Sequence, residues 1–318
     1  MSDQYEYRLP ATQAGYSLSP GVQRLGRKLF RNRILSRLKP YAQRLVAVTE
    51  NPGRLTFKTL PDQDTEHNSS GITVMSANLW HDWPRFRRLP ERLSAFARLV
   101  EAEQADILLL QEVARTPDLR ADEWLANRLG MAYVYSRANG HNTIGFEEGL
   151  AIFSRFPLNQ PRLSQLGNAN NPFVRRLVLG ANVDTPCGRL MAFSVHLGLQ
   201  HRQNARQQAE LRQYVNSLAC DQPALVGGDF NSHEYTSQIR RTKNAWVDTF
   251  RHLHPHADGH THVLRWPWGG ALKRHRLDYI FLSPVMPSWH VTDARHLTTS
   301  GETHSDHQIV LARLAPLN

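Results

Sequence analysis

From residue 71 onward, short runs of apolar residues alternate with polar segments along this 318-residue chain. Such runs, rich in Val, Ile, Leu and Phe, are typical of strands that are buried in a sheet. Eight runs therefore predict strands, at residues 72–80, 106–113, 149–157, 175–183, 189–198, 223–231, 276–283 and 307–314.

Stretches with helical spacing of their apolar residues lie between several of these runs. They predict helices at residues 89–103, 121–130 and 201–219. Because strands and helices are mixed along the chain, the pattern indicates an α/β fold of the sandwich kind, in which helices pack on sheets.

The first 48 residues differ from the rest in pattern and charge. They can form a helix that Pro40 interrupts, with an imperfect apolar stripe among arginines. The chain has a net charge of +10, and residues 1–49 hold nine basic residues against two acids. Two interpretations of this basic leader are equally favoured. It is a solvated helix, or it is a helix that binds nucleic acid or, through residues 22–45, an anionic membrane surface. An organelle-targeting peptide is a third reading, weakened by Asp3 and Glu6.

Residues 49–70 are polar and turn-rich and predict a linker or loops, with room for one strand, and the folded body is expected at residues 71–318. A hydrophobic content of 41% is enough for a sizeable core. No apolar run of membrane-spanning length and no secretory signal are found, and two cysteines predict neither a disulfide scaffold nor a zinc-thiolate site. We expect a cytoplasmic monomer, with peripheral membrane attachment through the leader as the alternative.

Several predicted strands turn polar near one end. A polar residue there is, by itself, more typical of a turn or cap, and a lone histidine is more typical of packing. Because these residues belong to strands of one core, together they predict a single cleft. They are Asn78, Glu112, His196, Asp229, Asn231, Asp278, Asp306 and His307.

The residue types indicate what such a cleft can do. Carboxylate and amide oxygens without thiolates suit Mg²⁺, and also Mn²⁺. Such an ion stabilises charge in the displacement of a phosphate ester, and a histidine can serve as general acid or base. In extended backbone, residues i and i+2 share a face, so Asp229 and Asn231 are expected to face the cleft together.

Seven motifs occur in a fixed order between residues 71 and 314: "SANLW", "LLLQEV", "GLAIFSRFP", "SVHLGL", "GGDFNS", "RLDYIFLS" and "SDHQIV". In this order they resemble the endonuclease/exonuclease/phosphatase superfamily, which has the deoxyribonuclease I-like fold. The resemblance implies a four-layer α/β/β/α sandwich with its site at the sheet edge. It also implies that Glu112 is the main metal ligand, with Asn78 and Asp306 beside it.

The same resemblance implies catalytic roles for the other polar residues. Asp229 would orient or deprotonate the attacking water, and Asn231 would hold the phosphate or the nucleophile. His307, paired with Asp278, would contact the scissile phosphate or serve as base. His196 matches the second histidine of the deoxyribonuclease I branch.

The segment "SVHLGLQHRQNARQQAELRQYV" is similar to bacterial-type members with a His-Leu-Gly-Leu motif. Abasic-site repair nucleases lack a histidine at that point, which argues against a repair role. Basic and aromatic residues in the loops can contact a polyanion, seat at a membrane interface or pack a loop. The candidates for substrate contact are Arg85, His141, Asn142, Trp268 and Arg276.

Three functions compete. The first is a Mg²⁺-dependent phosphodiesterase that cleaves nucleic acid, which family frequency and the basic, aromatic loops favour. The second is a sphingomyelinase-like lipid phosphodiesterase, or a phosphomonoesterase on a phosphorylated small molecule, with the leader as membrane anchor. The third, a protein that only binds a partner, is disfavoured because every expected catalytic position is filled.

Overall fold

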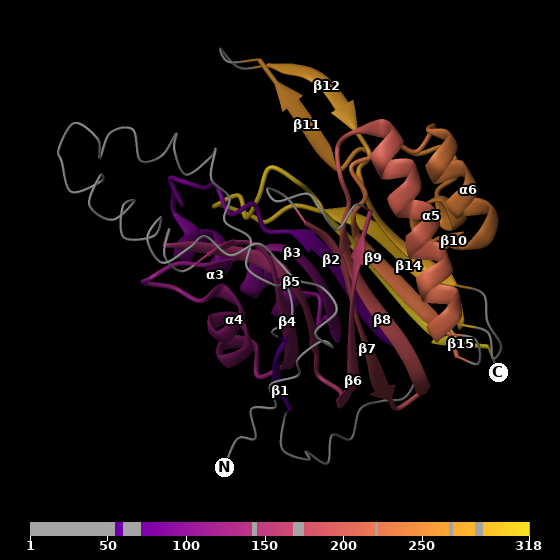
Figure 1. Ribbon diagram of the computed structural model, residues 1–318, viewed down its shortest axis with the longest axis horizontal. Helices are drawn as coiled ribbons and strands as arrows, with labels where there is room; N and C mark the ends of the chain where they lie inside the picture. Colours follow the sequence, from indigo (N-terminus) through magenta and orange to yellow (C-terminus); the bar gives the residue numbers. More distant parts are fainter. Residues whose placement is uncertain are drawn as a thin grey trace.

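The computed structural model of the chain describes residues 55–59, 71–141, 145–167, 175–219, 222–266, 270–283 and 289–317. These residues form two large sheets packed face to face, with helices on the outer side of each sheet (Figure 1). The predicted four-layer α/β/β/α sandwich is confirmed. The helix predicted for the leader lies outside the described residues.

The first sheet has seven strands. Their spatial order is β1 (Leu55–Lys58), β4 (Ala132–His141), β5 (Phe146–Ser154), β3 (Ile107–Arg115), β2 (Ile72–Asn78), β15 (Ile309–Pro316) and β14 (Trp289–Leu297). β2 and β3 are parallel, and the other neighbours are antiparallel. The single strand allowed for in residues 49–70 is present as β1, and because it pairs with β4 it belongs to the folded body.

The second sheet has six strands. A separate two-stranded hairpin projects from the body of the molecule (Figure 1). The order of the sheet is β10 (Val247–Asp248), β13 (Asp278–Ser283), β9 (Ala224–Asp229), β8 (Gly188–His196), β7 (Arg176–Thr185) and β6 (Leu158–Leu166). β8 and β9 are parallel. The hairpin consists of β11 (His262–Arg265) and β12 (Ala271–His275).

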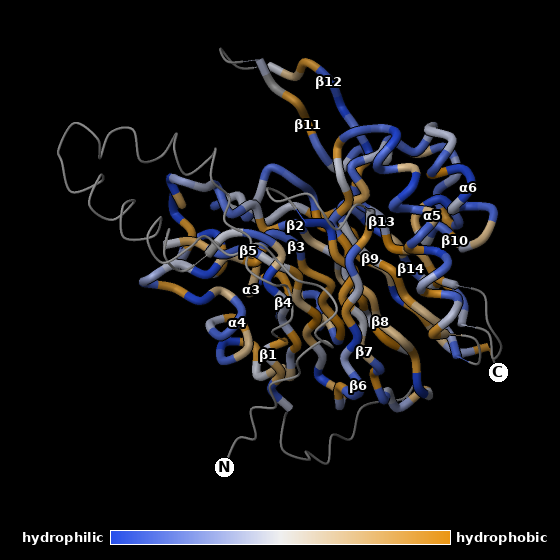
Figure 2. Tube along the Cα trace, in the orientation of Figure 1, coloured by the Kyte–Doolittle hydropathy of each residue, from blue (hydrophilic) through white to orange (hydrophobic). Residues whose placement is uncertain are grey.

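The helices cover the outer faces of the sheets. They are α3 (Leu89–Ala102), α4 (Ala121–Leu129), α5 (His201–Leu218), α6 (Ser237–Ala245) and α7 (Thr249–Leu253). Leu93 of α3 packs on the first sheet and Leu211 of α5 packs on the second. A third cluster, which includes Leu109 and Leu225, fills the space between the two sheets. Hydrophobic residues accordingly concentrate along the central strands (Figure 2).

All eight predicted strands and all three predicted helices are present. The strands β4, β6, β10, β11, β12 and β14 were not predicted. β6 and β14 lie at the edge of a sheet and form no continuous apolar run. β4 turns polar after Tyr135, β10 has two residues, and β11 and β12 are short strands of a hairpin outside the two large sheets.

The topology brings the polar strand ends together. Parallel strands place their carboxyl ends at the same edge of a sheet, and each sheet has one such pair at its centre. In the second sheet, Asp229 lies opposite both His196 on β8 and Asp278 on β13. The described residues therefore present one polar edge, to which both sheets contribute.

Candidate active site

Glu112 lies in a bulge of β3. The pairing of β3 with β5 is interrupted between Leu110 and Val113, and Glu112 has a left-handed φ of 52°. A left-handed conformation costs a residue with a side chain on the order of 1 kcal/mol, and a bulge commonly redirects a side chain. Glu112 is consequently partly exposed, whereas its neighbours Gln111 and Val113 are fully buried.

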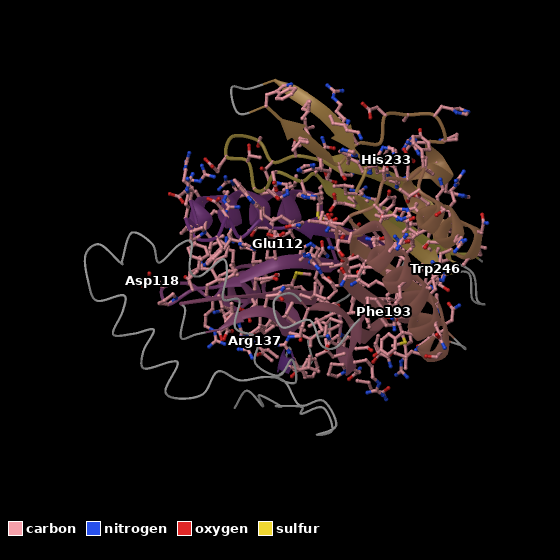
Figure 3. The ribbon with its side chains drawn as sticks, turned by 45° about the horizontal axis from the view of Figure 1, so that its top comes forward. Glu112, Asp118, Arg137, Phe193, His233 and Trp246 are labelled. Atoms are coloured by element: carbon pink, nitrogen blue, oxygen red, sulfur yellow. The ribbon has the colours of Figure 1, made fainter. Side chains whose placement is uncertain are left out.

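The carboxylate of Glu112 is held at both oxygens. Asn78 Nδ2 donates to Oε1 at 3.1 Å, and the backbone N–H of His81 donates to Oε2 at 3.2 Å. Burial raises the pKa of the Glu112 carboxyl, but the charges of His81 and His196 and the Asn78 bond outweigh burial and lower it to about 2. Glu112 is thus a carboxylate at neutral pH, among the polar side chains that surround it in Figure 3.

Asn78 connects Glu112 to the second sheet. Its Nδ2 also lies 3.3 Å from Asp229 Oδ2, and its Oδ1 accepts from the backbone N–H of Trp80 at 2.9 Å. Because Trp80 fixes the amide, the nitrogen faces the two carboxylates and the oxygen faces away. In this arrangement Asn78 orients both carboxylates, and its role as a metal ligand stays a prediction.

Asp229 is buried close to several ionisable groups. His196 Nε2 is 3.5 Å and His307 Nε2 is 4.0 Å from Asp229 Oδ2. Burial and then the charge of Asp278 raise the pKa of Asp229 to about 7, against the opposing effect of His307. A carboxyl with such a pKa can accept a proton near neutral pH.

Asn231 does not share the conformation assumed from the sequence. Its φ is 47°, and its backbone N–H donates to Asp229 Oδ1 at 2.8 Å, so the chain turns directly after β9. The alternation argument for Asp229 and Asn231 is therefore wrong, because it holds only for extended backbone. The Asn231 side chain donates to the Leu197 carbonyl at 2.9 Å and ties the loop after β9 to the loop after β8.

His307 and Asp278 form a close pair. His307 Nδ1 lies 2.8 Å from Asp278 Oδ2, and the Thr261 hydroxyl donates to the same oxygen at 2.6 Å. Burial lowers the pKa of His307, but Asp278 and Asp229 outweigh burial and raise it well above its usual value. Burial and Arg176 lower the pKa of His196 well below its usual value, so the two histidines differ in protonation at neutral pH.

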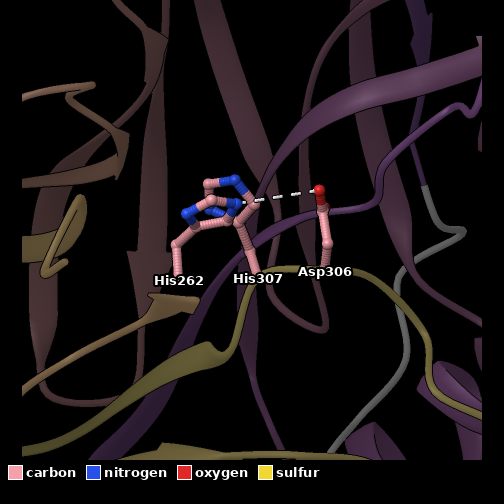
Figure 4. A group of neighbouring side chains, drawn as sticks. All are labelled: His262, Asp306 and His307. Atoms are coloured by element: carbon pink, nitrogen blue, oxygen red, sulfur yellow. Dashed lines mark ion pairs between the residues drawn. The ribbon is translucent and has the colours of Figure 1, made fainter. Parts of the chain in front are cut away.

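Asp306 lies at the outer side of this cluster, next to His262 and His307 (Figure 4). Its side chain is 44% exposed, and Oδ2 is 3.9 Å from His262 Nε2. One ligand atom from each of these three residues lies within 4.8 Å of the others, and the same holds for Asp229, Asp278 and His307. Asp278 Oδ1 is buried without a hydrogen-bond partner among the described residues. These carboxylate and imidazole donors fit a divalent cation.

The predicted substrate contacts have different outcomes. Arg85 is exposed in the loop between β2 and α3. Arg276 is only 1% exposed, and its guanidinium is bound to Asp248 at 2.6 and 2.7 Å. The prediction of a substrate contact for Arg276 is wrong, because this ion pair holds it in the interior. The side chain of His141 and the whole of Asn142 and Trp268 lie outside the described residues.

Three site residues escaped the sequence analysis. His81 contacts Glu112, Thr261 holds Asp278, and His262 packs on His307 with ring centroids 4.7 Å apart. All three stand in loops or at the start of the hairpin, where no apolar run marks a strand end. The signal for His81 was its position three residues after Asn78, whereas Thr261 and His262 approach the site only through the tertiary fold.

Comparison with known proteins agrees with this architecture. Residues 75–307 match the sequence model of the Endonuclease/Exonuclease/phosphatase family. The uncharacterized protein YbhP of Escherichia coli strain K12 is 30% identical over 194 residues, which cover 54% of this chain and 70% of YbhP.

Two solved structures show the same fold at lower identity. The human nocturnin catalytic domain, with a bound sulfate anion, has a TM-score of 0.63 and 20% identity, and the match covers 78% of this chain and 94% of nocturnin. A mannosyl-6-phosphatase of Bacteroides thetaiotaomicron has a TM-score of 0.57 and 21% identity, with 77% and 99% covered. Among the described residues, no helix is both long and apolar enough to span a membrane.

Proposed function

Because the chain belongs to the endonuclease/exonuclease/phosphatase family, whose members hydrolyse phosphate esters, we propose that it is a divalent-metal-dependent phosphodiesterase acting on nucleic acid. The observation that carries the proposal is the convergence of two sheets on one edge. There an ionised Glu112 is joined through Asn78 to Asp229, whose pKa is about 7. Asp229 lies 4.0 Å from His307 of the His307–Asp278 pair. Each of these groups has a protonation state suited to phosphate-ester hydrolysis.

We propose that Glu112 and Asp306 hold the cation, with Mg²⁺ as the first choice and Mn²⁺ as a substitute. When bound, the cation supplies positive charge that stabilises the phosphate oxygens during displacement. Asn78 keeps the Glu112 carboxylate in place through its 3.1 Å hydrogen bond.

The chain's own residues move the protons. Asp229 accepts a proton from the attacking water, for which its raised pKa suits it. His307, kept protonated by Asp278 and Asp229, donates from Nε2 to a phosphate oxygen or to the leaving oxygen. Asp278, fixed by Thr261, holds the His307 ring in the orientation that presents Nε2.

Nucleic acid is the first substrate to test, because basic side chains are exposed around this edge. Arg85 and Arg88 are exposed in the loop after β2, and Lys273 and Arg274 are exposed on the hairpin. Such side chains suit a polyanionic backbone. The second candidate is a lipid phosphodiester, because Leu264 and Leu272 of the hairpin are 46% and 45% exposed and aliphatic side chains do not stack on bases.

The test is a panel of phosphate esters that comprises single- and double-stranded DNA, RNA, sphingomyelin, a glycerophospholipid and an inositol phosphate. Each is incubated with the full chain in Mg²⁺, in Mn²⁺ and in chelator. Metal-dependent cleavage of DNA or RNA supports the proposal. Cleavage confined to a lipid or an inositol phosphate would change the proposed substrate and leave the proposed mechanism standing. If no ester is cleaved in a metal-dependent way, both the substrate and the mechanism are refuted.

A further inference from the structure

We propose that His262, Asp306 and His307 form a binding site for a transition-metal dication such as Zn²⁺, and that occupation of this site inhibits the hydrolase. The inhibition rests on the proposed function, whereas the binding does not. The site is assembled from the start of the hairpin and the segment before β15. A β-bridge joins His262 to His307, and the Gln308 N–H donates to the Thr261 carbonyl at 2.7 Å.

The geometry suits a small cation. One ligand atom from each residue lies within 4.8 Å of the others, and His262 Nε2 is 3.9 Å from Asp306 Oδ2 (Figure 4). Zinc binds nitrogen and oxygen ligands at about 2.0–2.2 Å, so neighbouring ligands of a tetrahedral site lie about 3.4 Å apart. The Asp306 side chain is 44% exposed, so it has room to rotate toward His262 and shorten this distance.

His307 already has the setting of a metal ligand. Its Nδ1 is paired with Asp278 at 2.8 Å, and Asp278 is held in turn by Thr261. Metal-ligating histidines typically bond a carboxylate through one ring nitrogen and bind the metal through the other, which here is Nε2.

His262 has a ring nitrogen that can serve as a metal ligand. Its Nδ1 is buried without a hydrogen-bond partner among the described residues, and Nε2 is too far from Asp306 for a hydrogen bond. Because Nε2 is the nitrogen that faces Asp306, it is the one available to the cation, and Nδ1 would take no part in binding. The ring packs on His307 at 4.7 Å, so both imidazoles approach the carboxylate from the same side.

The ligand types distinguish this site from the one proposed for Mg²⁺. Two imidazoles and one carboxylate suit zinc and other transition metals, whereas Mg²⁺ prefers oxygen ligands and water. A transition metal here would occupy His307 Nε2, the atom that donates to the phosphate, and would also take Asp306. Hydrolysis should therefore be inhibited by Zn²⁺ even in the presence of Mg²⁺.

The experiment titrates the metal-free full chain with Zn²⁺ by calorimetry and follows Co²⁺ binding by visible absorption. His262→Phe keeps a ring against His307 and removes the nitrogens. His275→Phe is the matched control, because His275 faces His262 across the hairpin. Glu112→Gln tests whether the metal binds at the carboxylates instead, and circular dichroism shows that each variant is folded.

We expect His262→Phe to weaken Zn²⁺ binding at least about tenfold, the smallest loss usual for perturbing a metal site. Asp306→Asn, a change at an exposed position, should weaken it too, while His275→Phe and Glu112→Gln bind as wild type does. Zn²⁺ binding that His262→Phe leaves unchanged, or that only Glu112→Gln abolishes, would overturn the site. If binding behaves as expected and Zn²⁺ does not inhibit, the inhibition is refuted and the site stands.

Discussion

At the shared edge of the sheets, the surroundings shift the pKa values of three ionisable side chains in different directions. The pKa of Glu112 falls to about 2, that of Asp229 rises to about 7, and that of His307 rises well above its usual value. Glu112 has histidine neighbours and two hydrogen-bond donors, whereas Asp229 is fully buried near Asp278. The same chemical group is therefore a permanent anion at one position and a proton acceptor at the other.

Asp229 should lower the stability of the fold at neutral and alkaline pH. Its pKa in the folded state is about 7, above its ordinary value of 3.8, so the folded state binds the proton more tightly than the unfolded state does. This contribution to the free energy of unfolding is fully present below pH 3.8 and is lost as the pH rises to about 7. Asp229→Asn keeps the side chain's size and the acceptor for the Asn231 N–H. In chelator, this variant should be more stable than wild type above pH 7, by on the order of a few kcal/mol, with the difference vanishing toward pH 4.

Thermal melting of both proteins from pH 4 to pH 9 measures this difference. The variant should also lose most of its hydrolytic activity, because the proton acceptor is gone. A variant that melts below wild type at pH 8 would show that Asp229 is stabilised as an anion.

Helix α5 organises two of the loops that carry site residues. Asn204 is fully buried, and its Nδ2 donates to the Gly198 and Phe230 carbonyls, each at 2.7 Å. Its Oδ1 accepts from Gln208 and from Ser232, also at 2.7 Å. With two donors and two acceptor bonds in use, the amide joins the loop after β8 to the loop after β9.

Asn204→Asp should lower kcat about 10- to 100-fold with little change in KM, because an acceptor would replace the donor facing two carbonyls and displace the catalytic loops. Thr242→Val is the matched control. Thr242 belongs to the same buried network, through Gln208 at 3.1 Å, and its other side-chain hydrogen bonds in the described part of the chain are to Arg212 and Gln238, which lie in helices. Both variants should lose about 1–3 kcal/mol of unfolding free energy, but only Asn204→Asp should lose kcat below its melting range. Equal kcat in the two variants would make Asn204 a stabilising residue only.

The elements differ in how far the sequence reveals them. The strands at the centre of each sheet were predicted from their continuous apolar runs, and the helices α3, α4 and α5 from the helical spacing of their apolar residues. The bulge at Glu112 and the turn at Asn231 were not, because both are left-handed residues set by tertiary pairing. Asp306 could be assigned to the site from the sequence because it precedes a predicted core strand. His262 could not, because it lies on a hairpin whose strands are mostly exposed and reaches His307 only through a β-bridge.

The charge of the molecule is divided unevenly. Residues 1–49 hold nine basic residues against two acids, and they supply most of the net charge of +10. We propose that this segment raises affinity for anionic surfaces and takes no part in the chemistry, because the site residues that the structure describes come from the two sheets and their loops.

Removal of residues 1–48 should therefore reduce binding to anionic vesicles or to nucleic acid and leave kcat on a small soluble phosphodiester unchanged. Flotation with anionic vesicles and nucleic-acid binding at increasing salt, each with and without the segment, measure the effect. The salt dependence should become shallower when the segment is removed. Loss of kcat on the small ester would assign the segment to the active site.

The most direct test of the account compares metal-dependent hydrolysis by wild type, Glu112→Gln and Glu147→Gln. The two glutamates are similarly exposed, at 17% and 19%, but Glu147 pairs with Arg137 at 3.5 Å, whereas Glu112 is bound by Asn78 and by the His81 N–H. On whichever phosphodiester the wild type cleaves, Glu112→Gln should lower kcat/KM at least about 100-fold with the fold intact, and Glu147→Gln should match wild type. Near-wild-type hydrolysis by folded Glu112→Gln would contradict the assignment of the active site to this edge.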